Sequence, residues 1–454
     1  MNRIVKGALA VLLSVSLTAC GTSGEESSLV LQEQSVSQLQ QLETTISASV
    51  TTTTAETTTE ERITQTETAA MTTEQTSTVS TTITTQATTT TALSTELPAA
   101  VSLDVRAIWI PATDLGNMLS GCDEAAFRKR VKSHLRQYQS LGINTIFLHV
   151  RSNGDSYYQS ALFPRGAYWS ANQAFDPLTV FLEESHTLGL SLHAWVNPLR
   201  CQTADQMTQI QGDYQTKQWV TAKDDRMVQV GSRWYMNPAY PEVRALVCAG
   251  VSEILAGYDV DGIHIDDYFY PTTAESFDAA AFKHAGAKNR AVWRTENINQ
   301  LVCAMYDTVK SCDRTRIFSV SPTGSIADNE QEQYADVRLW CSESGYLDWI
   351  IPQLYFGFFH ETYPFAETAK EWRGIVTNDE ISLMLGIATY KVGEYDDFAG
   401  AGAKEWTTDT LIPARQILFA DEMEGVEGVV LFSSATTRSL SDSEQNAIRH
   451  ALGS

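Results

Sequence analysis

The chain has 454 residues, of which 55 are acidic and 32 are basic, and its formal net charge at pH 7 is −23. Phosphates of nucleic acid and anionic lipid headgroups would repel so acidic a protein, so we expect neither as a direct partner. The length allows one large barrel or two ordinary domains after an exported N-terminal region.

Residues 1–20 have the pattern of a secretory signal. Two basic residues precede an apolar run at 8–17 that is too short to span a bilayer stably. The run LTAC at 17–20 resembles a bacterial lipobox. That resemblance implies cleavage before Cys20, lipidation of Cys20 and attachment to the outer face of the bacterial cell membrane. Ordinary secretion, with Cys20 incidental, is the alternative.

Residues 21–102 are rich in Thr, Ser, Gln and Glu and contain no aromatic residue. Such a composition buries too little apolar surface to offset chain entropy, so we expect a disordered spacer. A tether of this kind would let a lipid-anchored domain reach into a cell wall. The expected organisation is a signal at 1–20, a linker at 21–102 and a folded domain at 103–454.

The folded domain alternates short β-type runs with amphipathic helical stretches. Expected strands are 105–110, 144–150, 191–196, 262–266, 316–321, 348–355, 382–388 and 428–433. Expected helices include 124–141, 178–188, 241–256, 289–312 and 410–424. Eight repeats of strand and helix predict a TIM-type (β/α)8 barrel. A doubly wound sheet is the alternative, but its Gly-rich phosphate turn has no counterpart in IPATD at 110–114.

The fourth expected strand ends in two adjacent carboxylates, in the segment VDGIHIDDYFYP at 260–271. Strand alternation puts His264, Asp266 and Tyr268 on the face opposite to the apolar isoleucines. Carboxyl ends of barrel strands carry the chemistry of this architecture. An isolated Asp-Asp pair is more often a solvated turn, so the argument depends on the same pattern recurring at other strands.

The pattern of polar and aromatic residues recurs at the ends of the other expected strands, which are rich in side chains that bind sugars. Aromatic rings stack on the C–H faces of pyranose rings, while amides and guanidinium groups bond to hydroxyls. Any one of them is more often a packing residue, and their concentration at strand ends is the signal. The expected substrate-binding residues are Trp109, Arg151, Asn153, His193, Trp195, Asn197, Asn237, His264, Tyr268, Tyr270, Gln353, Tyr355 and Tyr390.

Several long motifs between 105 and 390 also carry a family resemblance. They are RAIWI, GINTIFLHVRSNGDSYYQSALFP, LHAWVNPLR, YMNPAYPEVR, VDGIHIDDYFYP, SVSPTG and DWIIPQLYF. In this order they resemble the glycosyl hydrolase-like 10 family (the DUF187 group). The resemblance implies a barrel glycoside hydrolase outside the cell, often a lipoprotein. One branch of the group acts on peptidoglycan glycan strands whose peptides have been removed, which is the substrate that the resemblance suggests.

A fold-level similarity to the α-amylase clan concerns the same strand. In that clan, strand four carries an Arg, one spacer and the nucleophilic Asp, and here His264 and Asp266 occupy those places. A histidine can be neutral, whereas the Arg keeps the nucleophile ionised. The clan's strand-five Glu is also missing from SVSPTG at 319–324. Its two-carboxylate pattern therefore cannot be transferred whole.

Glycoside hydrolysis usually needs a carboxylic acid and a carboxylate, ~5–5.5 Å apart for retention and ~6.5–9.5 Å apart for inversion. Asp266 is the first candidate for the key carboxylate. Asp267 is the second, because the turn into Tyr268 can break the strand alternation. Asp155 follows, from the loop after the second strand, and Asp114 could reach in from the first. Two close carboxylates raise one pKa and so supply a protonated acid, but the sequence does not assign the roles.

Two other classes of protein remain as alternatives. A carbohydrate-binding barrel that has lost catalysis would explain the missing strand-five Glu. A metal-dependent hydrolase or deacetylase would use His193, His264 and Asp266, yet the strand-one His-x-His of such barrels is absent. No nucleotide or redox motif and no zinc-type cysteine spacing occurs, so we expect no cofactor and no metal. We predict no protein partner, and both disulfides and free thiols remain open.

Overall fold

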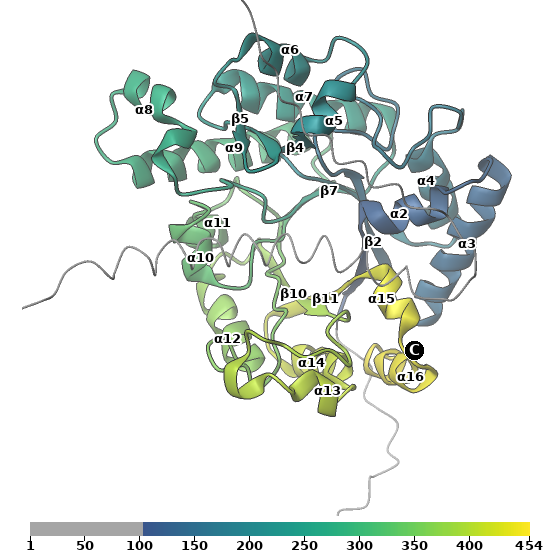
Figure 1. Cartoon of the computed structure of the whole chain (residues 1–454). Coiled ribbons are helices and arrows are strands. Elements are labelled where there is room, and N and C mark those ends of the chain that lie inside the picture. Colours follow the sequence, from purple (N-terminus) through teal and green to yellow (C-terminus); the bar gives the residue numbers. More distant parts are fainter. Residues whose placement is uncertain (1–102) are drawn as a thin grey trace, which may run out of the picture. The chain divides into compact units, whose positions relative to one another are not determined.

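The computed structural model describes residues 103–454, and the segments 1–20 and 21–102 lie outside the described residues. Eight parallel strands close into a barrel in the order β1-β11-β10-β9-β8-β7-β3-β2, which confirms the (β/α)8 prediction over the doubly wound sheet (Figure 1). The barrel strands are β1 (Val105–Ile110), β2 (Thr145–Arg151), β3 (Ser191–Val196), β7 (Gly262–Ile265), β8 (Ile317–Val320), β9 (Trp349–Ile350), β10 (Ser382–Ala388) and β11 (Val426–Phe432).

Helices surround the strands, and the five expected from the sequence are present with ends that differ by at most two residues. The longer helices are α3 (Glu124–Ser140), α4 (Pro177–Thr187), α7 (Pro241–Gly257), α9 (Arg290–Cys312), α12 (Phe365–Ile375), α14 (Ile412–Glu422) and α16 (Asp442–Ala451). Shorter ones are α2 (Ala112–Leu119), α5 (Ala204–Gln209), α6 (Gln215–Ala222), α8 (Ala279–Ala285), α10 (Ile326–Gln331), α11 (Val337–Ser342), α13 (Glu405–Thr408), α15 (Ser434–Ser439), η1 (Glu275–Phe277) and η2 (Gly400–Gly402).

The sixth barrel strand is much shorter than the sequence predicted. The expected strand covered 348–355, whereas β9 contains only two residues. Pro352 has no N–H to donate to a ladder, and beyond it Gln353 forms only isolated bridges, to Thr323 and Gly386. The chain after β9 is therefore irregular where it reaches the end of the barrel.

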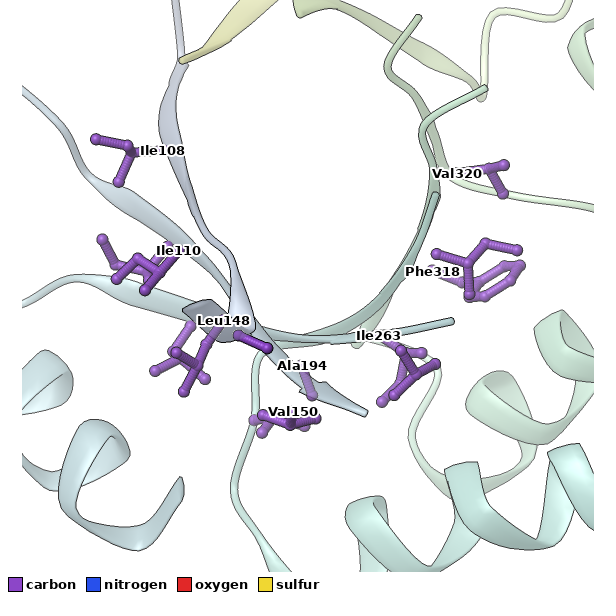
Figure 2. Close-up of a cluster of buried hydrophobic side chains, with 14 of the residues drawn as sticks. Ile108, Ile110, Leu148, Val150, Ala194, Ile263, Phe318 and Val320 are labelled. Carbon is purple, nitrogen blue, oxygen red and sulfur yellow. The ribbon is translucent and has the colours of Figure 1, made fainter. Parts of the chain in front are cut away.

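The two faces of the barrel sheet form two separate apolar cores. Outward side chains pack beneath the helices, as Figure 2 shows for Leu148, Ile263 and Phe318, all of which are fully buried. Inward side chains fill the barrel itself, where Trp109 and Trp195 belong to a smaller cluster. Strand alternation produces both cores from one sequence pattern.

Two inward glycines make room for large inward side chains. A Cβ atom at Gly262 would lie 2.5 Å from His193 Nδ1, and one at Gly386 would lie 3.1 Å from the Trp109 ring. Glycine at these positions lets bulky side chains of one strand fill the space next to another strand.

A three-stranded antiparallel sheet follows β3 and was not predicted. Its order is β4-β6-β5, with β4 (Arg200–Thr203), β5 (Met227–Val230) and β6 (Arg233–Met236). These strands are too short for a clear alternation of apolar and polar residues. The available signal was the two-residue loop between β5 and β6, which begins at Gly231 with a φ of 57°.

None of the helices within 103–454 is long and apolar enough to cross a membrane. The six cysteines in this part of the chain are all unpaired. The open question of disulfides is thus answered for the barrel, which is held by its two apolar cores and its hydrogen bonds.

The outer core gives a stability prediction. Leu148→Ala should lower the free energy of unfolding by about 2–5 kcal/mol, because Leu148 is fully buried between sheet and helices. Leu418→Ala, at a side chain that is 43% exposed on α14, should change it by less than about 0.5 kcal/mol. Urea unfolding followed by circular dichroism measures both. Equal losses in the two variants would mean that the outer core is wrongly located.

Candidate active site

Strand β7 carries the acidic pair to the C-terminal end of the barrel. It pairs with β3 and β8, and its register places His264 beside Trp195 on one side and Ser319 on the other. In-register residues of a parallel sheet point to the same face, and Trp195 belongs to the cluster inside the barrel. His264 therefore points inward, and Asp266, two residues later, lies inward just beyond the last residue of the strand.

His264 lies within the barrel rather than at its surface. Its Nε2 is 2.9 Å from the Trp109 Nε1 donor, and its Nδ1 is 2.8 Å from Ser319 Oγ. An indole N–H can only donate, so His264 Nε2 accepts and Nδ1 carries the proton. Burial and two neighbouring histidines hold the pKa of His264 well below its usual value, so the ring is neutral. The expected sugar contacts by His264 and Trp109 are corrected, because His264 is fully buried and Trp109 is 2% exposed within the inner core.

Asp266 is a buried acid whose charged form is disfavoured. Burial raises the pKa of Asp266 well above its usual value, and Asp267 raises it further. The Arg200 guanidinium, the backbone N–H of Tyr268 and the Trp195 indole act in the opposite direction. Its Oδ1 atom is buried and accepts no hydrogen bond from any residue in 103–454. This oxygen is available to a donor that arrives with a substrate.

Asp267 is half-buried and belongs to the same ionising unit. Burial raises its pKa, while a hydrogen bond with Gln353 and the charge of Arg200 lower it. Two acids that couple in this way release their protons as a pair, and like charges oppose the second ionisation. Burial and the repulsion between the two charges therefore both favour a protonated form of the pair.

Three aromatic rings from the last strands lie close together near the pair. Tyr355 and Phe432 are 5.6 Å apart between ring centroids, and Tyr390 lies 5.8 Å from Tyr355 and 6.0 Å from Phe432. Burial, Tyr390 and both acids raise the pKa of Tyr355 well above its usual value, so its hydroxyl stays protonated. The structure therefore groups the predicted residues Tyr355 and Tyr390, and the charges of both acids act on Tyr355.

Side chains from β3 and the segment after it also act on the pair. Trp195 stacks on His149 with ring centroids 3.7 Å apart, and its Nε1 donates to Asn197 Oδ1 at 3.1 Å. Arg200 lies over the ring of Tyr268 at 4.4 Å. The sequence already offered Arg200, in LHAWVNPLR, as a polar residue after the third expected strand, and the structure shows that its charge acts on both acids. Trp195, Tyr268 and Arg200 are thus placed at the pair.

Arg151 is not part of this group. The β2–β3 register shifts between His149 and Arg151, so strict alternation fails at the end of β2. The guanidinium is fully buried over Phe163 at 4.5 Å, and a Cβ atom at Gly250 of α7 would lie 2.2 Å from its Nη1. Arg151 therefore points outward between the sheet and α7, which corrects its predicted contact with a sugar.

Asp155 stabilises its own loop. Its Oδ1 accepts hydrogen bonds from the backbone N–H groups of Ser152 and Asn153 at 2.9 and 2.8 Å. Asn153 in turn accepts a hydrogen bond from Arg233 Nη1 at 2.6 Å. An Asp that closes a tight turn in this way is positioned by that turn. The structure therefore does not pair Asp155 with Asp266. Asn153 belongs to the same loop, and its side chain is bound by Arg233.

Two predicted asparagines are also used internally. Asn197 is fully buried and donates to the Ser152 carbonyl oxygen at 3.0 Å. Asn237 is fully buried too, and its side chain bonds to Asp225 O at 3.3 Å and to the Ala239 N–H at 3.1 Å. Both amides shape loops at this end of the barrel, so neither is free to bind a sugar as predicted.

His193 lies nearer to the N-terminal end of the barrel. It is 1% exposed, its ring centroid is 5.0 Å from that of Trp349, and burial lowers its pKa to about 4. It lines a pocket of about 340 Å³ together with Asp261 and Arg316. Asp261 precedes β7, so this pocket opens at the end opposite to the acidic pair. The predicted role of His193 in binding substrate is therefore also corrected.

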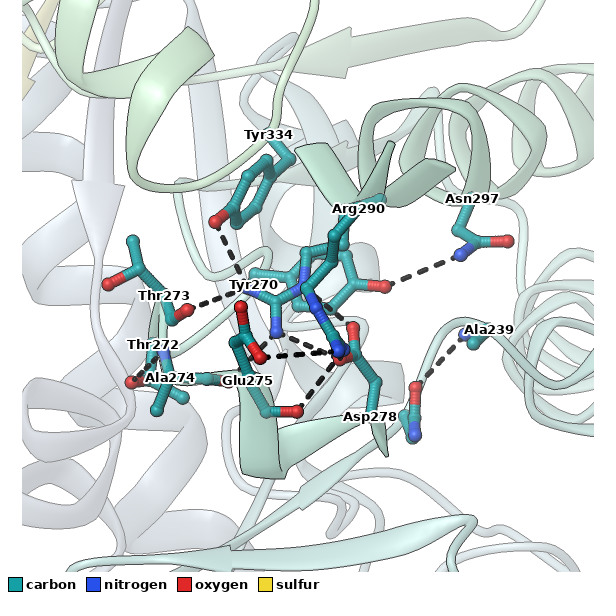
Figure 3. A network of polar contacts seen from close by, with 12 residues as sticks. Ala239, Tyr270, Thr272, Thr273, Ala274, Glu275, Asp278, Arg290, Asn297 and Tyr334 are labelled. Atoms are coloured by element: carbon teal, nitrogen blue, oxygen red, sulfur yellow. Dashed lines mark hydrogen bonds and ion pairs between the residues drawn. The ribbon is translucent and has the colours of Figure 1, made fainter. Parts of the chain in front are cut away.

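Tyr270 anchors the loop that follows the acidic pair (Figure 3). It is 3% exposed and lies 5.1 Å from the Arg294 guanidinium. Arg294 bonds to both oxygens of Asp278, at 2.6 and 2.8 Å, and to the Tyr334 hydroxyl at 3.0 Å. Tyr270 was predicted to touch the sugar, but it instead belongs to a buried network that holds the segment after Asp267 in place.

Asp114 also has a structural partner. Its carboxylate accepts hydrogen bonds from the Ser434 hydroxyl and, at 2.8 Å, from the Ala435 N–H at the start of α15. It thus joins the segment after the first barrel strand to the segment after the last one. No group of three or more His, Cys, Asp and Glu side chains in 103–454 is arranged to hold a metal ion.

A (β/α)8 barrel with two adjacent carboxyl groups and aromatic side chains at the C-terminal ends of its strands has the arrangement of a glycoside hydrolase site. The chain belongs to the Glycosyl hydrolase-like 10 family, whose profile matches residues 104–401. The match covers every barrel strand except the last, which confirms the resemblance seen in the sequence motifs.

Two relatives are named as glycosyl hydrolases, which supports this class of enzyme. Glycosyl hydrolase YngK of Bacillus subtilis (strain 168) is 28% identical over 362 residues, which cover 73% of this chain and 68% of that protein. Glycosyl hydrolase DigH of Escherichia coli (strain K12) is 30% identical over 332 residues, which cover 66% of this chain and 73% of that protein. The PgaB (BpsB) glycoside hydrolase domain from Bordetella bronchiseptica shares the fold, with a TM-score of 0.52 at 10% identity over 76% of this chain and 98% of that domain.

The charge of Arg200 gives a pH prediction. Arg200 lowers the pKa of both acids, so Arg200→Gln should raise both pKa values. The ionised member of the pair sets the acid limb of the kcat/KM profile and the protonated member sets the alkaline limb. Both limbs should therefore move to higher pH. Arg200→Lys keeps the charge and should leave both limbs of the kcat/KM profile near their wild-type positions. If Arg200→Gln also left both limbs unchanged, the charge of Arg200 would not act on the two acids.

Proposed function

We propose that this protein is a cell-surface glycoside hydrolase that cleaves O-glycosidic bonds in peptidoglycan glycan strands lacking their peptides. The observation that carries the proposal is the pair of adjacent carboxyl groups, Asp266 and Asp267, directly after β7 at the C-terminal end of the barrel. The charge of Asp267 raises the pKa of Asp266. A pair that holds one proton can protonate the departing oxygen and also stabilise the positive charge that develops on the sugar.

The surroundings of the pair suit a carbohydrate. Trp195, Tyr268 and Tyr355 supply ring faces and edges that can pack against a pyranose, and Gln353 and Arg200 supply donors for its hydroxyls. A bound sugar that displaced water from this site would strengthen the electrostatic interactions of both acids.

The choice of peptidoglycan depends on two lines of support from the sequence. The family resemblance includes a branch that acts on glycan strands whose peptides have been removed. The lipobox-like LTAC and the Thr-rich segment 21–102 would attach the barrel to the outer face of the cell membrane and give it reach into the wall.

The acidic pair is tested on peptide-free glycan strands by measuring reducing-end release in excess chelator. Asp266→Asn and Asp267→Asn should each lower kcat/KM by about 10²–10⁴-fold, because each removes a charge or a proton from the pair. Asp259→Asn is the matched control, since Asp259 precedes the same strand at its other end and its side chain is 88% exposed.

Three results would count against this proposal. Equal release by all variants would mean that the pair is structural. Activity of the wild type only without chelator would favour the metal-dependent alternative. Retention of glycan without release by the wild type would favour a carbohydrate-binding barrel.

The anchor is tested by Cys20→Ser in the native cell. The wild-type protein should fractionate with the membrane and incorporate labelled fatty acid, and the variant should do neither because it lacks the thiol that is lipidated. Immunoblots of the membrane, soluble and medium fractions measure this. A variant that stays with the membrane would point to retention by another segment.

A further inference from the structure

The carboxylates around the barrel end provide few candidates for a nucleophile. Besides Asp266, each buried carboxylate within 103–454 is already bound by neighbouring donors. Asp114 bonds to Ala435, Asp155 to Ser152 and Asn153, Glu184 to Arg128 and Lys132, Asp278 to Arg290 and Arg294, Asp396 to Lys391, and Glu405 to the N–H groups of Phe358 and Phe359. Among the buried acids of 103–454, Asp266 therefore remains for chemistry, and the half-buried Asp267 lies next to it.

These two acids lie at the end of one strand. Consecutive Cα atoms are about 3.8 Å apart, so both carboxyl groups approach a substrate from the same strand end. Two-carboxylate hydrolysis instead uses groups that flank the scissile bond, with the attacking carboxylate or its water on the side away from the acid. Tyr355 is a poor replacement, because its hydroxyl stays protonated. The buried acids within 103–454 and the neighbouring Asp267 therefore supply an acid and a negative charge, but no carboxylate on the opposite side of the scissile bond.

Sugars that carry an acetamido group at carbon 2 bring their own nucleophile. We infer that the substrate supplies the nucleophile, with its acetamido oxygen attacking carbon 1 while Asp267 protonates the leaving oxygen and Asp266 accepts a hydrogen bond from the acetamido N–H. This inference rests on the proposed function, whose glycan already consists of 2-acetamido-2-deoxy sugars, and it names the group that attacks. Carbohydrates that lack the group would not be hydrolysed at this position.

In the first step the acetamido oxygen bonds to carbon 1 as the bond from carbon 1 to the leaving oxygen breaks. The proton of Asp267 moves to the leaving oxygen, and the five-membered ring formed on the sugar carries the positive charge. In the second step water attacks carbon 1 and gives a proton back to Asp267. The new carbon–oxygen bond breaks, the acetamido group is restored, and the sum is hydrolysis with retention.

The burial of each acid assigns these two roles. Asp266 is 4% exposed, and its buried Oδ1 has no donor among the residues of 103–454. In the free enzyme, burial disfavours the charge of Asp266. An acetamido N–H donated to Oδ1 would satisfy this unpaired acceptor and favour its charged form, so substrate binding would shift the proton of the pair to Asp267. Asp267 is half-buried, so it can exchange protons with the leaving oxygen and with water.

The aromatic residues next to the acids suit the acetyl methyl group. The rings of Tyr355, Tyr390 and Phe432 have centroids 5.6–6.0 Å apart, which makes a compact apolar surface. Tyr355 is close enough to both acids for their charges to raise its pKa. A hydroxyl at carbon 2 would leave this surface unused.

The test uses wild-type enzyme and glycan strands that are de-N-acetylated and then re-acylated with acetyl, fluoroacetyl, difluoroacetyl or trifluoroacetyl groups. Each fluorine weakens the carbonyl oxygen as a nucleophile, so kcat/KM should fall at every step and by more than about tenfold across the series. Strands left with free amines should not be cleaved, and re-acetylation should restore cleavage.

The outcomes separate this inference from the proposed function. If no reducing ends were released from native or re-acetylated strands, the proposed function itself would be wrong. Release that is equal across the fluorinated series, or that continues on the free-amine strands, would overturn the acetamido mechanism alone. A glycosyl adduct on Asp266, Asp267 or Tyr355, detected by mass spectrometry of enzyme quenched during turnover, would also overturn it.

Binding measurements test the two roles without turnover. A sugar fused to a thiazoline ring copies the cyclic intermediate and should bind the wild type. Asp267→Asn should bind it within a few-fold of wild type, whereas Asp266→Asn should lose more than about tenfold in affinity by calorimetry. A larger loss of affinity in Asp267→Asn than in Asp266→Asn would exchange the two roles. A wild-type enzyme that cleaves glycan but does not bind the thiazoline would count against the cyclic intermediate.

Discussion

Closure of the parallel sheet is the constraint on which the rest of this structure depends. A closed barrel has no free edge, and every strand must direct alternate side chains inward and outward. In β7 this rule sends Ile263 to the outer core and His264 to the interior, where Trp109 and Ser319 bind both of its ring nitrogens. The same alternation brings Asp266 inward at the end of the strand, two residues after this buried, neutral and hydrogen-bonded histidine.

That neutral histidine determines how the acids behave. A cation at the position of His264 would hold Asp266 ionised, as the Arg of the α-amylase clan does for its nucleophile. A neutral histidine leaves burial and the repulsion between Asp266 and Asp267 as the main influences on their pKa values. Arg200 is the cation that moderates them, and it approaches from β4 outside the barrel rather than from below. Burial and repulsion thus favour the protonated form of the pair, and Arg200 favours the ionised form.

Polar residues near strand ends divide into those that meet a substrate and those that build the loops. Asp155, Asn197 and Asn237 have the residue types of a sugar site, yet each forms hydrogen bonds with backbone groups of the loops at this end of the barrel. Loops at a barrel end contain many backbone donors and acceptors that need partners. Such loops are therefore enriched in the same side chains that bind carbohydrate, which explains why composition alone overstates the size of the site.

The sequence by itself determined the eight strands, the closed barrel, the family and the acidic pair at the end of the fourth strand, because apolar alternation and local motifs are properties of neighbouring residues. It also indicated Trp195, Tyr268, Gln353, Tyr355 and Tyr390, which the structure places around the pair. Tertiary structure alone decided against Arg151, which a register shift in β2 turns outward, and it showed that Arg200, at the start of a short unpredicted sheet, acts on both acids. Both outcomes depend on contacts between residues far apart in the chain, and no local pattern records which side chain a distant strand will place beside a carboxylate.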